Sequence, residues 1–179
     1  TCALPICNDA EWLAEMATFV EQHPRFPAAS LAYARALLRH NDNAGADAVL
    51  VSALDKAPDH IELASLRAHV LLGRGAVELA LQQLIDITAN ARDGETSAFI
   101  AALQQRLGNH TAAVTAYREA LENGPQRGNW WIGLGISLDA LEQRGAAADA
   151  FQRALADRGL SEKLRHFAER RIGRIGQKT

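Results

Sequence analysis

The side chains that most often do chemistry are scattered through this 179-residue sequence. The histidines form no His-Glu-x-x-His pair and no cluster with cysteine, the arrangements that bind zinc. Their positions are His23, His40, His60, His69, His110 and His166. Cys2 and Cys7 are too few and too close together for a disulfide framework or a zinc site. We therefore expect no metal site and no cofactor.

Motifs for a nucleophile or a nucleotide are also missing from the sequence. There is no Gly-x-Ser-x-Gly elbow and no glycine-rich phosphate loop followed by lysine. The segment Gly133-Leu134-Gly135 falls within an expected helix, whereas a dinucleotide fingerprint follows a strand. Acidic pairs such as Glu119 and Glu122 have the spacing of a solvated helix face. The sequence predicts a protein that is not an enzyme and takes no small-molecule substrate.

Composition narrows the class further. Aromatic residues make up only 6% of the chain, which favours helices packed through small side chains over a β-sandwich. A net charge of −2 provides no global basic field, so we expect no nucleic-acid partner. No apolar run reaches the ~18 residues that could span a bilayer.

Residues 1–7 need a separate interpretation. The segment Thr1–Ile6 has the form of a translated sequencing adapter, so we expect an adapter-derived or disordered start and a longer natural gene. Two alternatives remain open. One is the end of a signal peptide, and the other is a lipoprotein box ending at Cys7, which would require that cysteine to be native and lipidated.

The rest of the chain repeats. Ala46, Ala80, Ala113 and Ala147 are spaced by 34, 33 and 34 residues. A large side chain follows each alanine by four residues, and a small residue precedes it by twelve. The residues of this signature are Ala34, Ala46, Leu50, Ala53, Ala68, Ala80, Leu84, Ala101, Ala113, Tyr117, Ala120, Trp131, Leu134, Gly135, Ala147, Phe151 and Ala154.

This period resembles the tetratricopeptide repeat, or TPR, in which two antiparallel helices, A and B, form each unit. The resemblance implies an all-α, right-handed solenoid of about 4.5 repeats plus a C-terminal capping helix. We expect a truncated repeat at 8–26, four units at 27–60, 61–93, 94–127 and 128–161, and a capping helix with a basic tail at 162–179. Helix A is expected at 28–40, 60–73, 95–107 and 129–143, and helix B at 44–56, 76–90, 110–123 and 146–158.

Local signals mark the expected boundaries. Pro27 suits a first helical turn, and Asp59 with Glu62 has a capping-box pattern. Ser161 is expected to cap the final helix. Glycines are expected in the tight turns between helices A and B, at Gly75, Gly108 and Gly145.

The TPR resemblance also implies a binding surface, because helix A lines the inner wall of such solenoids. The register places these residues on that wall: Leu31, Arg35, Leu38, Arg39, Glu62, Ser65, His69, Leu72, Ala98, Ala102, Gln105, Arg106, Asn129, Ile132, Ile136 and Asp139. Mixed apolar and arginine side chains suit a protein or peptide partner with acidic and apolar contacts.

Two features stand out from the repeat. Trp131 matches the TPR tryptophan and is expected in the core, whereas Trp130 is less constrained. Arg67 falls where helix A usually has a large aliphatic residue. Two interpretations stay open: the stem of Arg67 lies over the edge of the core, or the repeat register is off by one at this position.

Three segments resemble the MshN family of MSHA-type pilus biogenesis proteins. They are Gln105–Gly108, Trp130–Leu134 and Leu160–Leu164. The resemblance implies a periplasmic TPR domain, anchored in the inner membrane by an upstream segment, that binds pilus-assembly components. A TPR lipoprotein pilotin or envelope adaptor and a cytoplasmic TPR adaptor remain alternatives.

Overall fold

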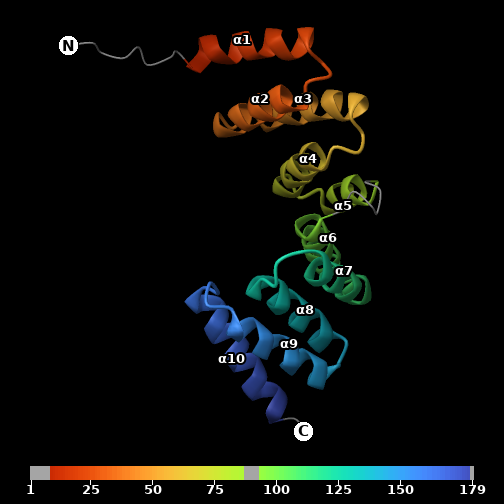
Figure 1. Ribbon diagram of the computed structural model, residues 1–179, viewed down its shortest axis with the longest axis vertical. Coiled ribbons are helices and arrows are strands. Elements are labelled where there is room, and N and C mark those ends of the chain that lie inside the picture. The colour runs from red at the N-terminus through yellow and green to blue at the C-terminus, as the bar shows by residue number, and fades with distance from the viewer. Residues whose placement is uncertain (1–8, 87–92, 178–179) are drawn as a thin grey trace, which may run out of the picture. The chain divides into compact units, whose positions relative to one another are not determined.

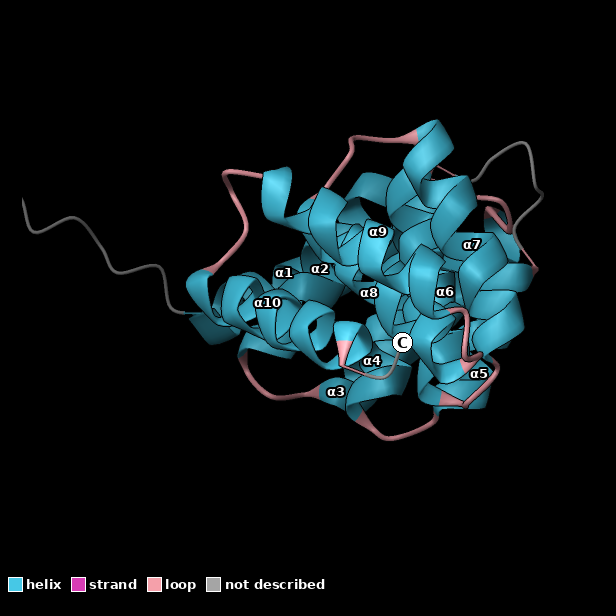
Figure 2. Ribbon diagram, turned by 90° about the horizontal axis from the view of Figure 1, so that it is seen from below, coloured by secondary structure: helices cyan, strands magenta, loops and turns pink. Residues whose placement is uncertain are grey.

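The computed structural model describes residues 9–86 and 93–177, and within these ranges all regular structure is helical (Figures 1 and 2). The expected adapter-like start at 1–7, with Cys2 and Cys7, lies outside the described residues, as does the end of the basic tail. The chain divides into two compact units, residues 1–91 and 92–179. The all-α repeat fold expected from the 34-residue period is confirmed.

The first unit is built from two helical hairpins preceded by a single helix. Its helices are α1 (Asp9–Gln22), α2 (Pro27–Arg39), α3 (Asn43–Lys56), α4 (Ile61–Gly73) and α5 (Val77–Ile85). Helix α2 packs on α3, α4 packs on α5, and α3 also contacts α4. Pro27 stands at the start of α2, where its missing N–H leaves no helical hydrogen bond unmade.

The second unit has the same plan with an added last helix. Its helices are α6 (Gly94–Arg106), α7 (His110–Asn123), α8 (Gly128–Ala140), α9 (Arg144–Ala156) and α10 (Glu162–Gly176). Hairpins α6–α7 and α8–α9 stack through α7 and α8, and α10 packs on α9. Because α10 lies where the next helix A would lie, it covers the apolar side of the last hairpin.

The small residues of the repeat signature are buried. In helix A, Ala34, Ala68 and Ala101 are 0% exposed. Their partners on helix B have the same exposure: Ala46, Ala80, Ala113 and Ala147. The large helix-B residues are also inside, with Leu50, Leu84 and Phe151 at 0% and Tyr117 at 5%. The remaining small positions on helix B, Ala53, Ala120 and Ala154, are buried as well.

One hydrogen-bonded turn recurs inside all four hairpins. Each turn has a residue with positive φ: Asn41 (61°), Gly75 (80°), Gly108 (79°) and Glu142 (59°). The N–H of the following residue donates to a carbonyl five residues back, at 2.9 Å in every case. This is the Schellman geometry that ends a helix and satisfies its last carbonyl groups. The four turn residues are 34, 33 and 34 residues apart, like the helix-B alanines, so the turn is part of the repeating unit.

The prediction of a turn at Gly145 is wrong. Gly145 is the second residue of α9, and the chain reverses three residues earlier, at Glu142. A search for glycine missed this turn because a glutamate adopts the left-handed conformation there. As a result α8 ends before, and α9 begins before, the expected bounds.

Helix starts also differ from expectation. The N-cap of α4 is His60, whose Nδ1 accepts from the Leu63 N–H at 3.4 Å, so the Asp59–Glu62 capping box is wrong. Ser161 occupies the N-cap position of α10, but its hydroxyl makes no capping hydrogen bond. Side-chain caps do form at Asp42 and Asp93, each accepting a backbone N–H at 2.8 Å.

Two glycines of α8 allow large side chains from neighbouring helices to reach its backbone. A Cβ at Gly133 would lie 2.2 Å from Cζ of Tyr117, and one at Gly135 would lie 2.7 Å from Cε1 of Phe151. Tyr117 is enclosed in this way, and burial raises its pKa to about 12. Packing of α8 against α7 and α9 therefore requires glycine at positions 133 and 135.

We expect Gly133→Ala to destabilise the protein by about 1–3 kcal/mol, because the added methyl group displaces the Tyr117 ring. The matched control is Gly173→Ala in α10, where a Cβ would meet nothing within 4 Å. That change should stabilise by up to about 1 kcal/mol through helix propensity. Urea unfolding followed by circular dichroism measures both, and equal effects would contradict the packing argument.

We expect Glu142→Gly to stabilise the protein by about 0.5–1 kcal/mol, because glycine removes the steric cost of the left-handed conformation. The reciprocal change, Gly75→Ala, should destabilise by about 1 kcal/mol through φ alone, since open space surrounds its Cβ position. Thermal melting of both variants checks the shared turn. A loss of stability in Glu142→Gly would show that its side chain matters more than its backbone.

Candidate protein-binding surfaces

The expected helix-A wall of the first unit is formed in part. Arg35 and Arg39 are exposed on α2, and neither makes an ion pair or a side-chain hydrogen bond with a described residue. Leu38 is half-buried beside them. Leu31 is only 5% exposed, so its assignment to the wall is wrong: its side chain packs between helices. The α2 face therefore presents two unpaired guanidinium groups beside a partly exposed leucine.

The α4 part of this wall is more polar. Glu62 and His69 are exposed, whereas Ser65 and Leu72 are half-buried. The Nδ1 of His69 lies 2.8 Å from the Ser65 carbonyl oxygen, one helical turn back. This contact holds the imidazole against its own helix.

In the second unit, several residues expected on the open wall are buried or paired with another helix. Ile132 and Ala98 are 4% and 7% exposed, so their assignment to an open wall is wrong. Asp139 forms an ion pair with Arg171 of α10, which leaves it partly covered. The exposed members are Ala102, Arg106 and Asn129, with Ile136 half-buried.

Gln105 joins two helices of the second unit. Its Nε2 donates to the Gly133 carbonyl at 2.8 Å and lies 2.6 Å from the hydroxyl of Ser137, which is fully buried. Gly133 and Ser137 follow Gln105 by 28 and 32 residues and both lie on α8, so the Gln105 amide links α6 to α8. Gln105 is therefore a packing residue first, and Arg106 beside it is the group left free for a partner.

A cleft that sequence reasoning missed opens between α7 and α9 of the second unit. Its volume is about 370 Å³, and its floor is apolar, formed by Leu121, Leu134 and Leu138. Arg118 and Glu122 line it from α7, and Ala146, Asp149, Ala150 and Arg153 from α9. Gln126 lines the same cleft, and its Nε2 donates to the Leu121 carbonyl.

Trp131 stands at the end of this cleft, and the two adjacent tryptophans have exchanged their expected places. Trp130 is the buried one, at 4% exposure, packed against Gly124 with the Arg127 guanidinium 5.5 Å from its ring centroid. Trp131 is half-buried, and the Arg153 guanidinium lies 5.0 Å from its ring centroid. The expectation that Trp131 is a core residue is wrong: its ring forms a wall of the cleft.

The first unit contains the same cleft, between α1 and α3. Its volume is about 540 Å³. The floor residues Val20, Tyr33 and Leu37 precede Leu121, Leu134 and Leu138 by 101 residues, the length of three repeats. The cleft therefore recurs in both units, each time where two B helices flank one A helix.

In the next repeat, Arg67 stands at the position that Tyr33 and Leu134 occupy in the floors of the two clefts. Its Nε donates to Asp47 Oδ1 at 3.0 Å, and its Nη1 donates to Gln83 Oε1. Arg74 donates to the other oxygen of Asp47, also at 3.0 Å. The expectation that Arg67 lies over the core edge agrees with this position, and its head group is held by α3 and α5.

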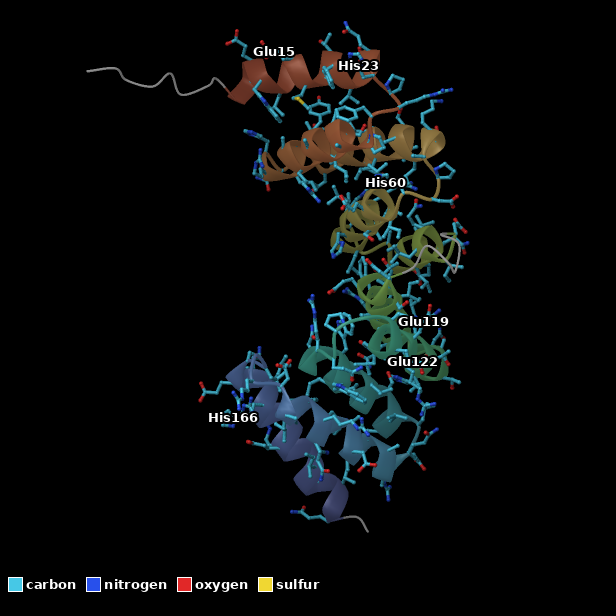
Figure 3. All side chains as sticks on the ribbon, viewed as in Figure 1. Glu15, His23, His60, Glu119, Glu122 and His166 are labelled. Atoms are coloured by element: carbon cyan, nitrogen blue, oxygen red, sulfur yellow. The ribbon has the colours of Figure 1, made fainter. Side chains whose placement is uncertain are left out.

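Within residues 9–86 and 93–177, the acidic and histidine side chains labelled in Figure 3 lie on or next to several different helices. Figure 3 shows Glu119 and Glu122 on α7, whereas His166 lies on α10. His166 is close to Glu169 and Glu162, at 3.2 and 3.7 Å, on an exposed surface. Among the residues that the structure describes, no group of three or more His, Cys, Asp or Glu could hold a metal ion. No helix in those ranges has the length and apolar character to cross a membrane.

Asp157 is the carboxylate most strongly engaged by the backbone. Its Oδ2 accepts the Gly128 N–H at 2.7 Å, and its Oδ1 accepts the Gly159 N–H at 2.8 Å. These hydrogen bonds, with a smaller contribution from the charge of Arg165, lower the pKa of Asp157. The side chain ties the start of α8 to the end of α9.

Each of the two units has the arrangement of a helical-repeat scaffold of the protein-interaction class. Residues 7–143 match the family described as the tetratricopeptide repeat-like domain, and the chain belongs to this family.

Solved structures agree on the fold. A MamA crystal structure superposes with a TM-score of 0.74 at 14% identity, covering 87% of this chain and 82% of that one. The MamA 41-end fragment from Desulfovibrio magneticus RS-1 gives 0.69 at 20% identity, covering 82% and 84%. The Cut9–Hcn1 hetero-tetramer of the APC/C gives 0.67 at 17% identity, covering 96% of this chain and 33% of that one. No curated protein matches the sequence.

We expect stability to fall in acid partly through Asp157. A carboxyl group with a lowered folded-state pKa stabilises the fold above its unfolded pKa, near ~4, and this contribution is lost as pH falls through the folded value. Asp157→Asn should therefore melt lower than wild type at pH 7, and the difference should shrink toward pH 2. Melting curves across this range test it, with Asp149→Asn as the control, since Asp149 has no ion-pair or hydrogen-bond partner among the described residues. A difference that stays constant with pH would exclude the carboxylate's charge as the cause.

Proposed function

We propose that this chain is the periplasmic repeat domain of an inner-membrane-anchored protein that helps to assemble a type IV pilus of the MSHA type. In this role it catalyses no reaction and binds other assembly components. The pilus role is supported by the three segments that resemble the MshN family, Gln105–Gly108, Trp130–Leu134 and Leu160–Leu164.

These segments belong to one part of the molecule. Gln105, in the first segment, donates to the carbonyl of Gly133, in the second. Leu160, which opens the third, is 8% exposed just before α10. All three therefore contribute to the packing of the second unit, which supports a likeness in a folded unit as well as in short motifs.

The observation that carries the binding role is the unpaired arginine on helix A. Arg35 and Arg39 lie one turn apart on α2, so both guanidinium groups lie on one face. Arg106, in the second unit, is likewise exposed and unpaired within the described part of the chain. An unpaired, exposed guanidinium is well suited to bind a carboxylate of a protein partner in bidentate fashion. The helix-A faces therefore favour a partner with acidic and apolar side chains.

The natural gene and the purified components of an MSHA-type pilus test the biological role. We expect an upstream transmembrane segment in the gene and direct binding of the repeat domain to at least one pilus-assembly component in biolayer interferometry. A gene that encodes a lipoprotein signal, or no export signal, together with no binding to any component, would overturn the pilus role.

We expect the double variant Arg35→Glu/Arg39→Glu to weaken binding to that component at least about tenfold, because each reversal replaces an attraction by a repulsion. The matched control is Arg25→Glu/Lys56→Glu, which changes the net charge of the same unit equally at exposed positions away from the helix-A face. Helicity should be unchanged in both. Equal affinities of the two double variants would remove the binding role of the α2 face.

A further inference from the structure

The cleft around Trp131 has a chemistry that the repeat does not require. A second depression of about 340 Å³ lies on the other side of Trp131 and is lined by Gln126, Arg153 and Arg158, among others. Trp131 and Arg153 line both depressions, so the two hollows adjoin at this stacked pair. A partly exposed tryptophan next to arginine is the composition typical of energetically dominant positions in protein interfaces.

Comparison with the equivalent cleft of the first unit separates packing from function. The apolar floor is present in both clefts, as stacking of the repeats requires. At the positions of Trp131, Arg118 and Arg153, 101 residues earlier, the first unit has Ser30, Ala17 and Ser52. The repeat therefore packs without a large aromatic ring and without either arginine. Trp131 stands at the position of the TPR tryptophan, whereas the fold accounts for neither arginine.

The charges of the cleft are unused. Arg118 and Glu122 lie one turn apart on α7, and Asp149 and Arg153 lie one turn apart on α9. The side chain of none of the four makes an ion pair or hydrogen bond with a described residue. A pair of opposite charges at this spacing on a helix can close into an ion pair, yet both pairs stay open beside the apolar floor.

The Trp131 end of the cleft is cationic. Arg153 and Arg158 are there, and Arg158 is exposed without a partner in the described ranges. The nearby carboxylate, Asp157, already accepts two backbone N–H groups, at 2.7 and 2.8 Å. The free groups at this end are therefore two guanidinium ions beside an aromatic face, which complement a carboxylate that follows an apolar side chain.

We propose that this cleft, on the helix-B side of the second unit, binds a protein segment in which one large apolar residue is flanked by aspartate or glutamate. The apolar side chain enters the hollow over Leu121, Leu134 and Leu138 and stacks against Trp131. The carboxylate pairs with Arg153 and Arg158. This site is separate from the helix-A faces and does not depend on the pilus role.

A displayed library of random twelve-residue peptides, selected on the full chain, tests the proposal. We expect the recovered peptides to carry Asp or Glu within two positions of Leu, Ile, Phe, Tyr or Trp. Synthetic copies should bind Arg153→Glu at least about tenfold more weakly and Trp131→Ser/Arg118→Ala/Arg153→Ser at least about thirtyfold more weakly than wild type. The triple variant gives the second cleft the residues of the first, so a folded state is expected. Arg153→Glu, a single exposed change, gives a second measure if the triple variant unfolds.

Two controls define the outcome. Arg170→Glu reverses one exposed charge on α10 of the same unit and should leave affinity unchanged. In a Trp12→Phe background, the bound peptide should reduce acrylamide quenching of tryptophan, because Trp131 is the more exposed of the two that remain. Failure to recover any binding peptide would overturn the proposal. Peptides without acidic residues would do the same, as would peptides that bind Arg153→Glu as tightly as wild type. If peptides that bind Arg153→Glu as tightly as wild type bind Arg35→Glu/Arg39→Glu more weakly, the binding role of the α2 face is supported and that of the Trp131 cleft is excluded.

Discussion

The structure depends on the close approach of two helices within each hairpin. At the contact, helix A and helix B each carry an alanine or a glycine that is removed from water, as at Ala34 and Ala46. With so little side chain between them, the backbones come near enough for a tight Schellman turn to join them, and for a large helix-B residue to fill the space beside the pair. Gly135 shows the limit of this arrangement, since the ring of Phe151 occupies the place where a Cβ would stand.

Because that contact repeats along the chain, residues on the cleft floors can be compared with residues on the cleft rims. The floor of each outer cleft is apolar because the next hairpin packs on it, whereas the rim faces water and is free to change. The first unit has Ala17 and Ser52 on this rim, and the second has Arg118 and Arg153. In the repeat between them, Arg67 stands at the floor position held by Tyr33 and Leu134 in the two clefts, and its head group is held by Asp47 and Gln83. One scaffold therefore carries three different local chemistries without a change in backbone.

Polar groups in this molecule mostly organise the backbone. Gln105 connects α6 to α8, Asp157 connects the start of α8 to the end of α9, and Asp42 and Asp93 cap helices. Arg35 and Arg39 on the α2 face, and Arg118 and Arg153 on the rim of the Trp131 cleft, are among the charged groups without an ion pair in the described residues. Because a buried or engaged charge has little to offer a partner, the arginines that bind a partner must come from the unengaged ones.

The sequence by itself determined the helical class, the repeat length, the burial of its small residues and two of the four turns. These properties follow from residue type and spacing along the chain, which is why glycine at 75 and 108 was a sufficient signal. It did not reveal the turns at Asn41 and Glu142, because a non-glycine residue enters the left-handed region only when the helices around it require the turn there.

Only the tertiary structure decided which residues at the edges of each buried helix face are covered by a neighbouring helix. Trp130 and Trp131 are adjacent, so they point about 100° apart on α8, and the rotation of α8 between α7 and α9 selects the buried one. The same rotation buries Ile132, and that of α2 buries Leu31, both of which the register had placed on an open wall. A repeat period assigns a residue to a helix, but exposure depends on how closely two other helices approach, and that distance is set by side chains far away in the chain.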